Sequence, residues 1–194
     1  RFKDIRSISR AANIWISDAA QLRVLMINPQ TLAPQALRTI AGSPTAEGFT
    51  DGIGGNARLT LDTLLYATFD FPNTPSGYIY VILSHASIRC LRRAKVDPFY
   101  PHASNTTIST LIGSCGATTS ATMVDGAASK ARFAGPTVMA MYGTRMFILD
   151  GARTLRKLDT TNIILSTVSE TFTGDVSATQ FLIQRVNELL FVSA

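Results

Sequence analysis

The chain has 194 residues, of which 46% are hydrophobic and 16% charged, and 18 Lys and Arg against 13 Asp and Glu give a net charge of +5. The charged fraction is below the roughly 25% of an average soluble domain, and the hydrophobic fraction excludes a mainly disordered chain. The apolar runs are too short for a membrane-spanning helix, so we expect no membrane span.

Short runs of Val, Ile, Leu, Thr, Tyr and Phe follow one another along the chain, separated by Gly, Pro, Asn, Asp and Ser. Such runs are typical of β-strands, and few segments are long enough for a helix with a period of 3.6 residues. The predicted fold class is therefore all-β. Four of the runs, NIWISD, YIYVIL, RMFILD and LLFVSA, align on an aromatic column formed by Trp15, Tyr80, Phe147 and Phe191.

Three further strands are predicted around each aromatic run, one before it and two after it. In the first strand after the run, the segments LRVL, IRCL and LRKL align so that Arg23, Arg89 and Arg156 are equivalent. Four short strands per unit, repeated with turns between them, predict the blades of a β-propeller. The predicted units cover about 1–42, 60–113 and 137–169, with a partial unit at 179–194.

A ten-residue motif occurs twice between these units, as TDGIGGNARL at 50–59 and as VDGAASKARF at 124–133, in one register 74 positions apart. We expect its glycines to adopt the positive φ of a tight turn and its aspartates to bond nearby backbone. The motif is interpreted as an inter-blade connector whose small Ala permits close backbone approach and whose last residue wedges between sheets. The connector residues are Asp51, Gly52, Ala57, Arg58 and Leu59, and then Asp125, Gly126, Ala131, Arg132 and Phe133.

Cysteine and histidine are too few for an elaborate site. Cys90 and Cys115 permit a single disulfide, the alternative being two buried free thiols. Neither cysteine belongs to a CxxC pair, and the two histidines, His85 and His102, do not complete a zinc site. We therefore predict no metal and no cofactor.

A polar, Pro-containing insertion lies at 94–107, between the third and fourth strands of the second unit. It carries the sequence NTT, which makes Asn105 a candidate for N-glycosylation. Because binding surfaces in repeat folds usually lie on loops, the insertion is the first candidate for a partner contact. We expect its deletion to spare folding while weakening assembly or binding.

These motifs resemble the NHL-repeat family of β-propellers. The resemblance is best over STLIGS, VDGAASKARFAGPTVMAM and RMFILDGARTLRKL, and extends over about 13–169. It implies four-stranded blades, about three of them in this chain plus the start of a fourth. Leu83 departs from the pattern, because the other units carry Asp18 and Asp150 at that place. Since NHL-like propellers generally have more blades, we expect this region to belong to a longer protein, with its remaining blades or other protein chains as partners.

Three functions are compatible with these residues. The one we favour is a non-enzymatic scaffold or protein-interaction module of a cell-surface or extracellular assembly, consistent with a sequon and a possible disulfide. The alternative is an intracellular propeller that binds single-stranded RNA through a basic face, with the three repeated arginines as a stripe. The second alternative is a lactonase-type or lyase-type propeller enzyme, but the sequence has no HExxH, G-x-S-x-G or P-loop motif, and no catalytic residue is predicted.

Overall fold

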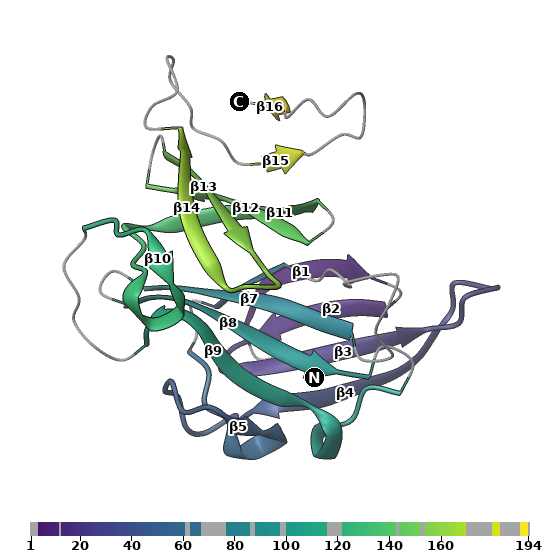
Figure 1. The fold of residues 1–194 in the computed structure, drawn as a ribbon. Helices are drawn as coiled ribbons and strands as arrows, with labels where there is room; N and C mark the ends of the chain where they lie inside the picture. Colours follow the sequence, from purple (N-terminus) through teal and green to yellow (C-terminus); the bar gives the residue numbers. More distant parts are fainter. Residues whose placement is uncertain are drawn as a thin grey trace.

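The computed structural model describes residues 4–11, 13–60, 63–66, 77–85, 88–97, 100–115, 122–142, 144–151, 154–169, 180–182 and 191–193. These residues form an all-β structure of four antiparallel sheets joined by turns and loops (Figure 1). Over the described ranges, helical structure is limited to three short 3-10 turns. They are η1 (Gly54–Asn56), η2 (Ala103–Asn105) and η3 (Ala128–Lys130).

The first sheet is an antiparallel meander in which consecutive strands pair with each other in chain order. It contains β1 (Ile5–Ala11), β2 (Asn13–Asp18), β3 (Gln21–Ile27) and β4 (Pro34–Gly42).

The second and third sheets repeat this meander and add a short strand at the outer edge, so each has five strands instead of the predicted four. The added strands, β5 (Gly52–Ile53) and β10 (Gly126–Ala127), belong to the two connectors. The second sheet also has β6 (Thr63–Tyr66), β7 (Gly77–His85), β8 (Ile88–Val96) and β9 (Thr107–Ser114), and the third has β11 (Pro136–Tyr142), β12 (Arg145–Asp150), β13 (Thr154–Asp159) and β14 (Ile164–Ser169).

Beyond the third sheet, β15 (Gln180–Leu182) pairs with β16 (Phe191–Ser193), and β15 contacts β11. Contacts also join β1 to β6 and β6 to β11, so the first strands of successive sheets are neighbours. None of the described sheets closes on itself.

The aromatic residues of the predicted column occupy matching places in the strand ladders. Trp15 pairs with Val24, Tyr80 with Arg93 and Phe147 with Lys157, in each case between the second and third strands of a meander. Phe191 lies in β16 opposite Leu182. Trp15 is fully buried and Phe147 is half-buried.

Two hydrophobic cores lie between the sheets. The first joins Trp15, Val24 and Ile40 of the first sheet to residues of β8 and β9, and the second joins β8 and β9 to the third sheet. Each core also contains two residues of a connector, Ala57 and Leu59 in the first and Ala131 and Phe133 in the second. The connectors are therefore part of the packing between sheets and not merely links.

The conformation of the glycines differs from the prediction in one respect. Gly126 has a φ of +142°, but Gly52 is not among the residues with positive φ. The left-handed residue of the first connector is Gly54, with a φ of +52°, and Ala128 takes the equivalent place in the second, with a φ of +39°. In the first connector the turn that needs such a residue begins at η1, two residues after Gly52.

We predict that Gly54→Ala destabilises the protein by about 1–3 kcal/mol, because a left-handed residue with a side chain is strained and a Cβ there would lie 2.5 Å from the carbonyl oxygen of Ala103. Urea unfolding measures the change. Gly55→Ala is the matched control, since its Cβ would meet nothing closer than 4.0 Å. Equal losses from the two variants would contradict the close approach of η1 and η2.

Candidate functional site

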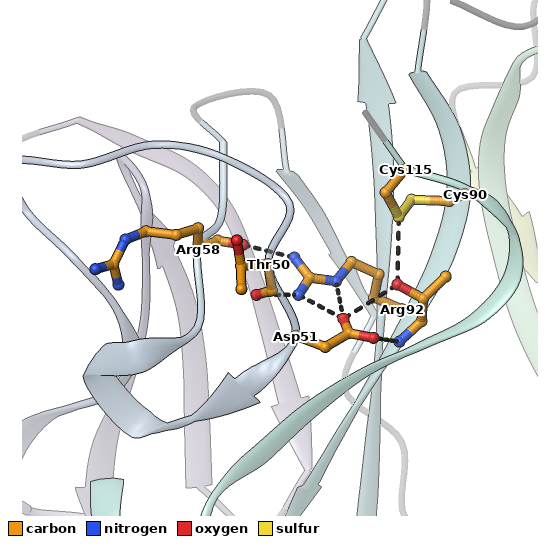
Figure 2. The surroundings of a disulfide bond; sticks show 7 residues. Thr50, Asp51, Arg58, Cys90, Arg92 and Cys115 are labelled. Carbon is orange, nitrogen blue, oxygen red and sulfur yellow. Dashed lines mark hydrogen bonds and ion pairs between the residues drawn. A yellow bond between two sulfur atoms is a disulfide. The ribbon is translucent and has the colours of Figure 1, made fainter. Parts of the chain in front are cut away.

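The side chain of Arg92, on β8, is held by the first connector (Figure 2). It is 0% exposed, and Nη1 donates to the carbonyl of Arg58 at 2.6 Å and Nη2 to the carbonyl of Thr50 at 2.9 Å. Its Nη2 also pairs with Oδ1 of Asp51 at 2.8 Å. A buried guanidinium needs acceptors for its N–H groups, and the connector supplies most of them. Burial lowers the pKa of Arg92, and the hydrogen bond and charge of Asp51 oppose that shift.

The same aspartate also binds β9 of the second sheet. Oδ2 of Asp51 accepts the backbone N–H of Thr110 at 2.7 Å, and Oδ1 accepts the Thr110 hydroxyl at 3.1 Å. Asp51 thus joins β8 and β9 through one carboxylate. We call Arg92, Asp51 and Thr110, with the carbonyls of Thr50 and Arg58, the first clasp.

The third sheet repeats this arrangement with the second connector. Arg156, on β13 and 0% exposed, donates to the carbonyls of Val124 at 3.1 Å and Arg132 at 3.2 Å and pairs with Asp125 at 2.7 Å. Asp125 accepts the backbone N–H of Thr167 at 2.9 Å and its hydroxyl at 3.0 Å. These groups form the second clasp, and every connector atom in it is displaced by 74 residues from its counterpart in the first.

The two arginines of the connectors, Arg58 and Arg132, donate hydrogen bonds to carbonyls of their own connectors. Arg58 donates through Nη1 to its neighbour's carbonyl at Ala57, at 2.9 Å, and Arg132 does the same to Ala131 at 2.8 Å. Both also donate one turn back, to the carbonyls of Gly55 and Ser129. Each repeated residue of the connector therefore has a structural contact.

A second carboxylate distinguishes the clasp of the third sheet. Asp150, at the end of β12 and 0% exposed, pairs with Arg156 Nη1 at 2.8 Å and accepts the N–H groups of Ala134 and Gly135. In the first sheet, Asp18 pairs with Arg23 at 2.6 Å. The second sheet has Leu83 at the equivalent register, opposite Cys90. Arg92 therefore pairs with one carboxylate, that of Asp51, where Arg156 pairs with two.

The predicted equivalence of Arg89 with Arg23 and Arg156 is wrong. In the ladders, Arg23 pairs with Thr39, Arg92 with Thr110 and Arg156 with Thr167, each directly after a register shift. The hairpin between β7 and β8 is longer than its counterparts and closes at His85 and Ile88, which displaces the arginine by three positions. Arg23 is 13% and Arg156 0% exposed, so these two do not offer the basic stripe that RNA binding would need.

Cys90 and Cys115 form a disulfide with a Cα separation of 5.4 Å (Figure 2). Cys90, on β8, is buried in the core between the first two sheets, and Cys115 follows β9 and is half-buried. The Sγ of Cys115 lies 3.5 Å from the hydroxyl of Thr110, which also donates to Asp51. The disulfide thus adjoins the first clasp.

The described residues of the insertion, 94–97 and 100–107, pack against the first sheet and the first connector. Its first residues continue β8, and η2 contacts both β4 and η1. Gly54 donates its N–H to the carbonyl of Thr106 at 2.9 Å, and Arg38 of β4 approaches the carbonyl of Pro101 at 3.5 Å. The insertion thus contacts both the first sheet and the first connector, and the expected effect of its deletion on folding and binding stays a prediction.

Asn105 ends η2 with an exposed side chain. Its Oδ1 accepts the N–H of His102 at 2.9 Å, and its Nδ2 donates to the carbonyl of Tyr100 at 3.2 Å. A glycan on Nδ2 would leave one N–H on that nitrogen, so the contact with Tyr100 is compatible with modification.

In the described ranges, no three His, Cys, Asp or Glu side chains converge in a way that could hold a metal ion. The His102 ring is occupied by its own turn, with Nδ1 3.0 Å from the hydroxyl of Ser104. The side chain of His85 lies outside the described residues, as do those of Tyr80, Arg89 and Phe191. In that same described part, no helix has the length and apolarity required to cross a bilayer.

No protein-family model and no curated protein matches the chain. Among solved structures, it is similar to an auxiliary nutrient binding protein of Bacteroides thetaiotaomicron (16% identity, 80% of this chain and 32% of that one, TM-score 0.47) and to another from Bacteroides ovatus (14%, 84% and 35%, 0.49). It is also similar to a candidate phosphatase of Bacteroides thetaiotaomicron (14%, 85% and 34%, 0.53), a likeness of fold alone. The chain spans about a third of the length of each.

The two buried arginines differ in what their removal leaves behind. We expect Arg156→Met to destabilise the protein by about 3–5 kcal/mol, because it leaves the buried carboxylate of Asp150 without its cationic partner. Arg92→Met leaves Asp51 without its cationic partner, but Asp51 is 44% exposed, so we expect a smaller loss of stability. Urea unfolding of both variants measures the difference. Adding Asp150→Asn to Arg156→Met should recover part of the loss, and no recovery would contradict an effect of buried charge.

The second clasp predicts a pH dependence. Desolvation raises the pKa of Asp125, but hydrogen bonds from Thr167 and the charge of Arg156 outweigh it, so this pKa lies below its ordinary 3.8. A carboxyl whose folded pKa is depressed stabilises the fold above its unfolded pKa, and that stability is lost as pH falls through the folded pKa.

Asp125→Asn should therefore be less stable than wild type near neutral pH, and the deficit should shrink as the pH falls below 3.8. Urea unfolding of both proteins across this range tests the expectation. A deficit that stays constant with pH would show that the carboxylate charge is not what holds Thr167 and Arg156.

Proposed function

We propose that the chain forms part of a β-propeller with NHL-like blades and acts as a non-enzymatic scaffold or protein-interaction module of a cell-surface or extracellular assembly. The observation that carries this proposal is the double clasp, which directs the repeated charged side chains toward the protein itself. Residues used in this way position sheets and do not act on a substrate. Their repetition is consistent with an architectural role.

The propeller architecture is supported by the strand arrangement. Each meander runs in chain order, and β1, β6, β11 and β15 are successive neighbours, as the inner strands of adjacent blades would be. The connectors fill the cores between sheets, which suits a stack in which each unit buries its faces against the next.

A location outside the cytosol is supported by two features of the second sheet. Disulfides persist mainly in secreted and cell-surface proteins, and Cys90 and Cys115 are bonded. The sequon residue Asn105 is exposed, near Tyr100, whose surface is 73% exposed. The described part of the insertion contacts the first sheet and the first connector, which supports it as the surface that a protein partner binds.

The proposal is tested on protein secreted from eukaryotic cells, by peptide mass spectrometry without reduction. We expect a linked Cys90–Cys115 peptide and a glycan at Asn105, and the Thr107→Ala variant, which removes the sequon, should lack the glycan. Secreted material with two free thiols and an unmodified Asn105 would count against the extracellular assignment.

Titration of the same protein with a single-stranded oligouridine distinguishes the scaffold hypothesis from the RNA-binding alternative. We expect only weak, salt-sensitive binding, with a Kd of about 100 µM or above, as for non-specific attraction to a basic protein. Binding of the oligouridine much tighter than this, retained at physiological salt, would overturn the scaffold assignment.

A further inference from the structure

The disulfide encloses the segment that supplies both partners of Asp51. The loop closed by Cys90 and Cys115 has a sequence separation of 25 residues and contains Arg92 and Thr110. Cross-linking a segment restricts the conformations that its residues can adopt once local structure opens. The ion pair and the two hydrogen bonds to Asp51 are therefore all made from within one covalent ring.

The third sheet has no such ring in the corresponding place. Thr154 occupies the register of Cys90, opposite Asp150, whereas Cys90 itself lies opposite Leu83. In the third sheet the buried arginine gains a second carboxylate from that opposing residue. In the second sheet the opposing residue is Leu83, which offers no carboxylate, and Cys90 forms the disulfide with Cys115. The two sheets thus secure the same clasp in different ways.

We propose that the Cys90–Cys115 disulfide is a redox-sensitive latch for the first clasp, taking the part that the buried Asp150 has in the second. Its reduction releases Thr110 and Arg92 from Asp51 and loosens the connector at 50–59. The first clasp thereby depends on the redox state of its surroundings, and the second does not. This inference is independent of which partner the scaffold binds.

Access and chemistry favour attack at one sulfur. Cys115 is half-buried and follows the end of β9, whereas Cys90 is 0% exposed. A thiolate of a dithiol reductant attacks Sγ of Cys115, forming a mixed disulfide, and the Sγ of Cys90 leaves as a thiolate and takes up a proton. The second thiol of the reductant then closes a cyclic disulfide and releases the Cys115 thiol. The protein gains two electrons and two protons, and the dithiol is oxidised.

We expect release of this latch to act first on the joint between the first and second sheets. The connector at 50–59 places Ala57 and Leu59 in the core between the first and second sheets, and η1 contacts η2 of the docked insertion. The core between the second and third sheets also includes Leu91, Leu111 and Ile112 from inside the ring, but its connector residues and the second clasp contain no cysteine. The repeated structure therefore provides its own internal control.

Amide hydrogen exchange in the native state, measured before and after reduction with dithiothreitol, tests the proposal. The amides of Thr110 and Thr167 are matched probes, since each donates to its clasp aspartate. We expect exchange at Thr110 to accelerate at least about tenfold on reduction while Thr167 changes by less than about twofold. An unchanged Thr110, or equal acceleration at both sites through global unfolding, would overturn a local latch.

A second variant set keeps the test independent of reductant. Cys90→Thr with Cys115→Ser should reproduce the fast exchange at Thr110. Adding Leu83→Asp, which recreates the Asp150 and Thr154 pairing of the third sheet, should restore most of the lost protection. Failure of the added carboxylate to slow exchange at Thr110 would show that the disulfide and Asp150 are not equivalent devices.

Discussion

A charged guanidinium inside a protein must be surrounded by acceptors, and this requirement shapes each joint between the sheets. Arg92 and Arg156 are fully buried, and each is bonded to two backbone carbonyls and a carboxylate of the preceding connector. Leaving such a group unpaired would cost several kcal/mol, on the order of a domain's entire stability. These bonds restrict the conformation of the connector. The same conformation that brings its carbonyls to the arginine also places its apolar residues in the core.

The clasp aspartates also accept backbone N–H groups near the edges of the sheets. Outer strands expose unpaired N–H and C=O groups that can pair with other chains. The added strands β5 and β10 each cover only two residues of β9 and β14, and beyond them Asp51 and Asp125 accept the N–H groups of Thr110 and Thr167. One carboxylate thus neutralises a buried cation and occupies an edge donor, which suits a repeat unit that should stack with its neighbours and not with foreign strands.

Sequence patterns predicted the all-β class, since strand-forming runs bounded by turn residues report it directly. They missed Arg92, because the alignment assumed a constant distance from the aromatic column, and hairpin length is set by strand pairing that the sequence does not display. The segment CLRRAK carried the signal, since Leu91-Arg92 matches Leu22-Arg23 and Leu155-Arg156. The glycine that adopts the left-handed turn was misplaced for a similar reason, since Gly52 and Gly54 are both compatible with the motif. The added edge strands were missed because two residues give no periodicity.

The departure at Leu83 shows how a repeat can differ without losing its geometry. Replacing a buried aspartate by leucine removes a desolvated charge but leaves the arginine with fewer ionic partners. The second sheet keeps its arginine bonded through Nε and Nη2 to one aspartate, whereas Arg156 divides its two Nη groups between two aspartates. A covalent bond beside the clasp then restricts β8 and β9, where the third sheet uses charge. Because a disulfide can be reduced and an ion pair cannot, this difference would make the first clasp sensitive to redox conditions that leave the second clasp unchanged.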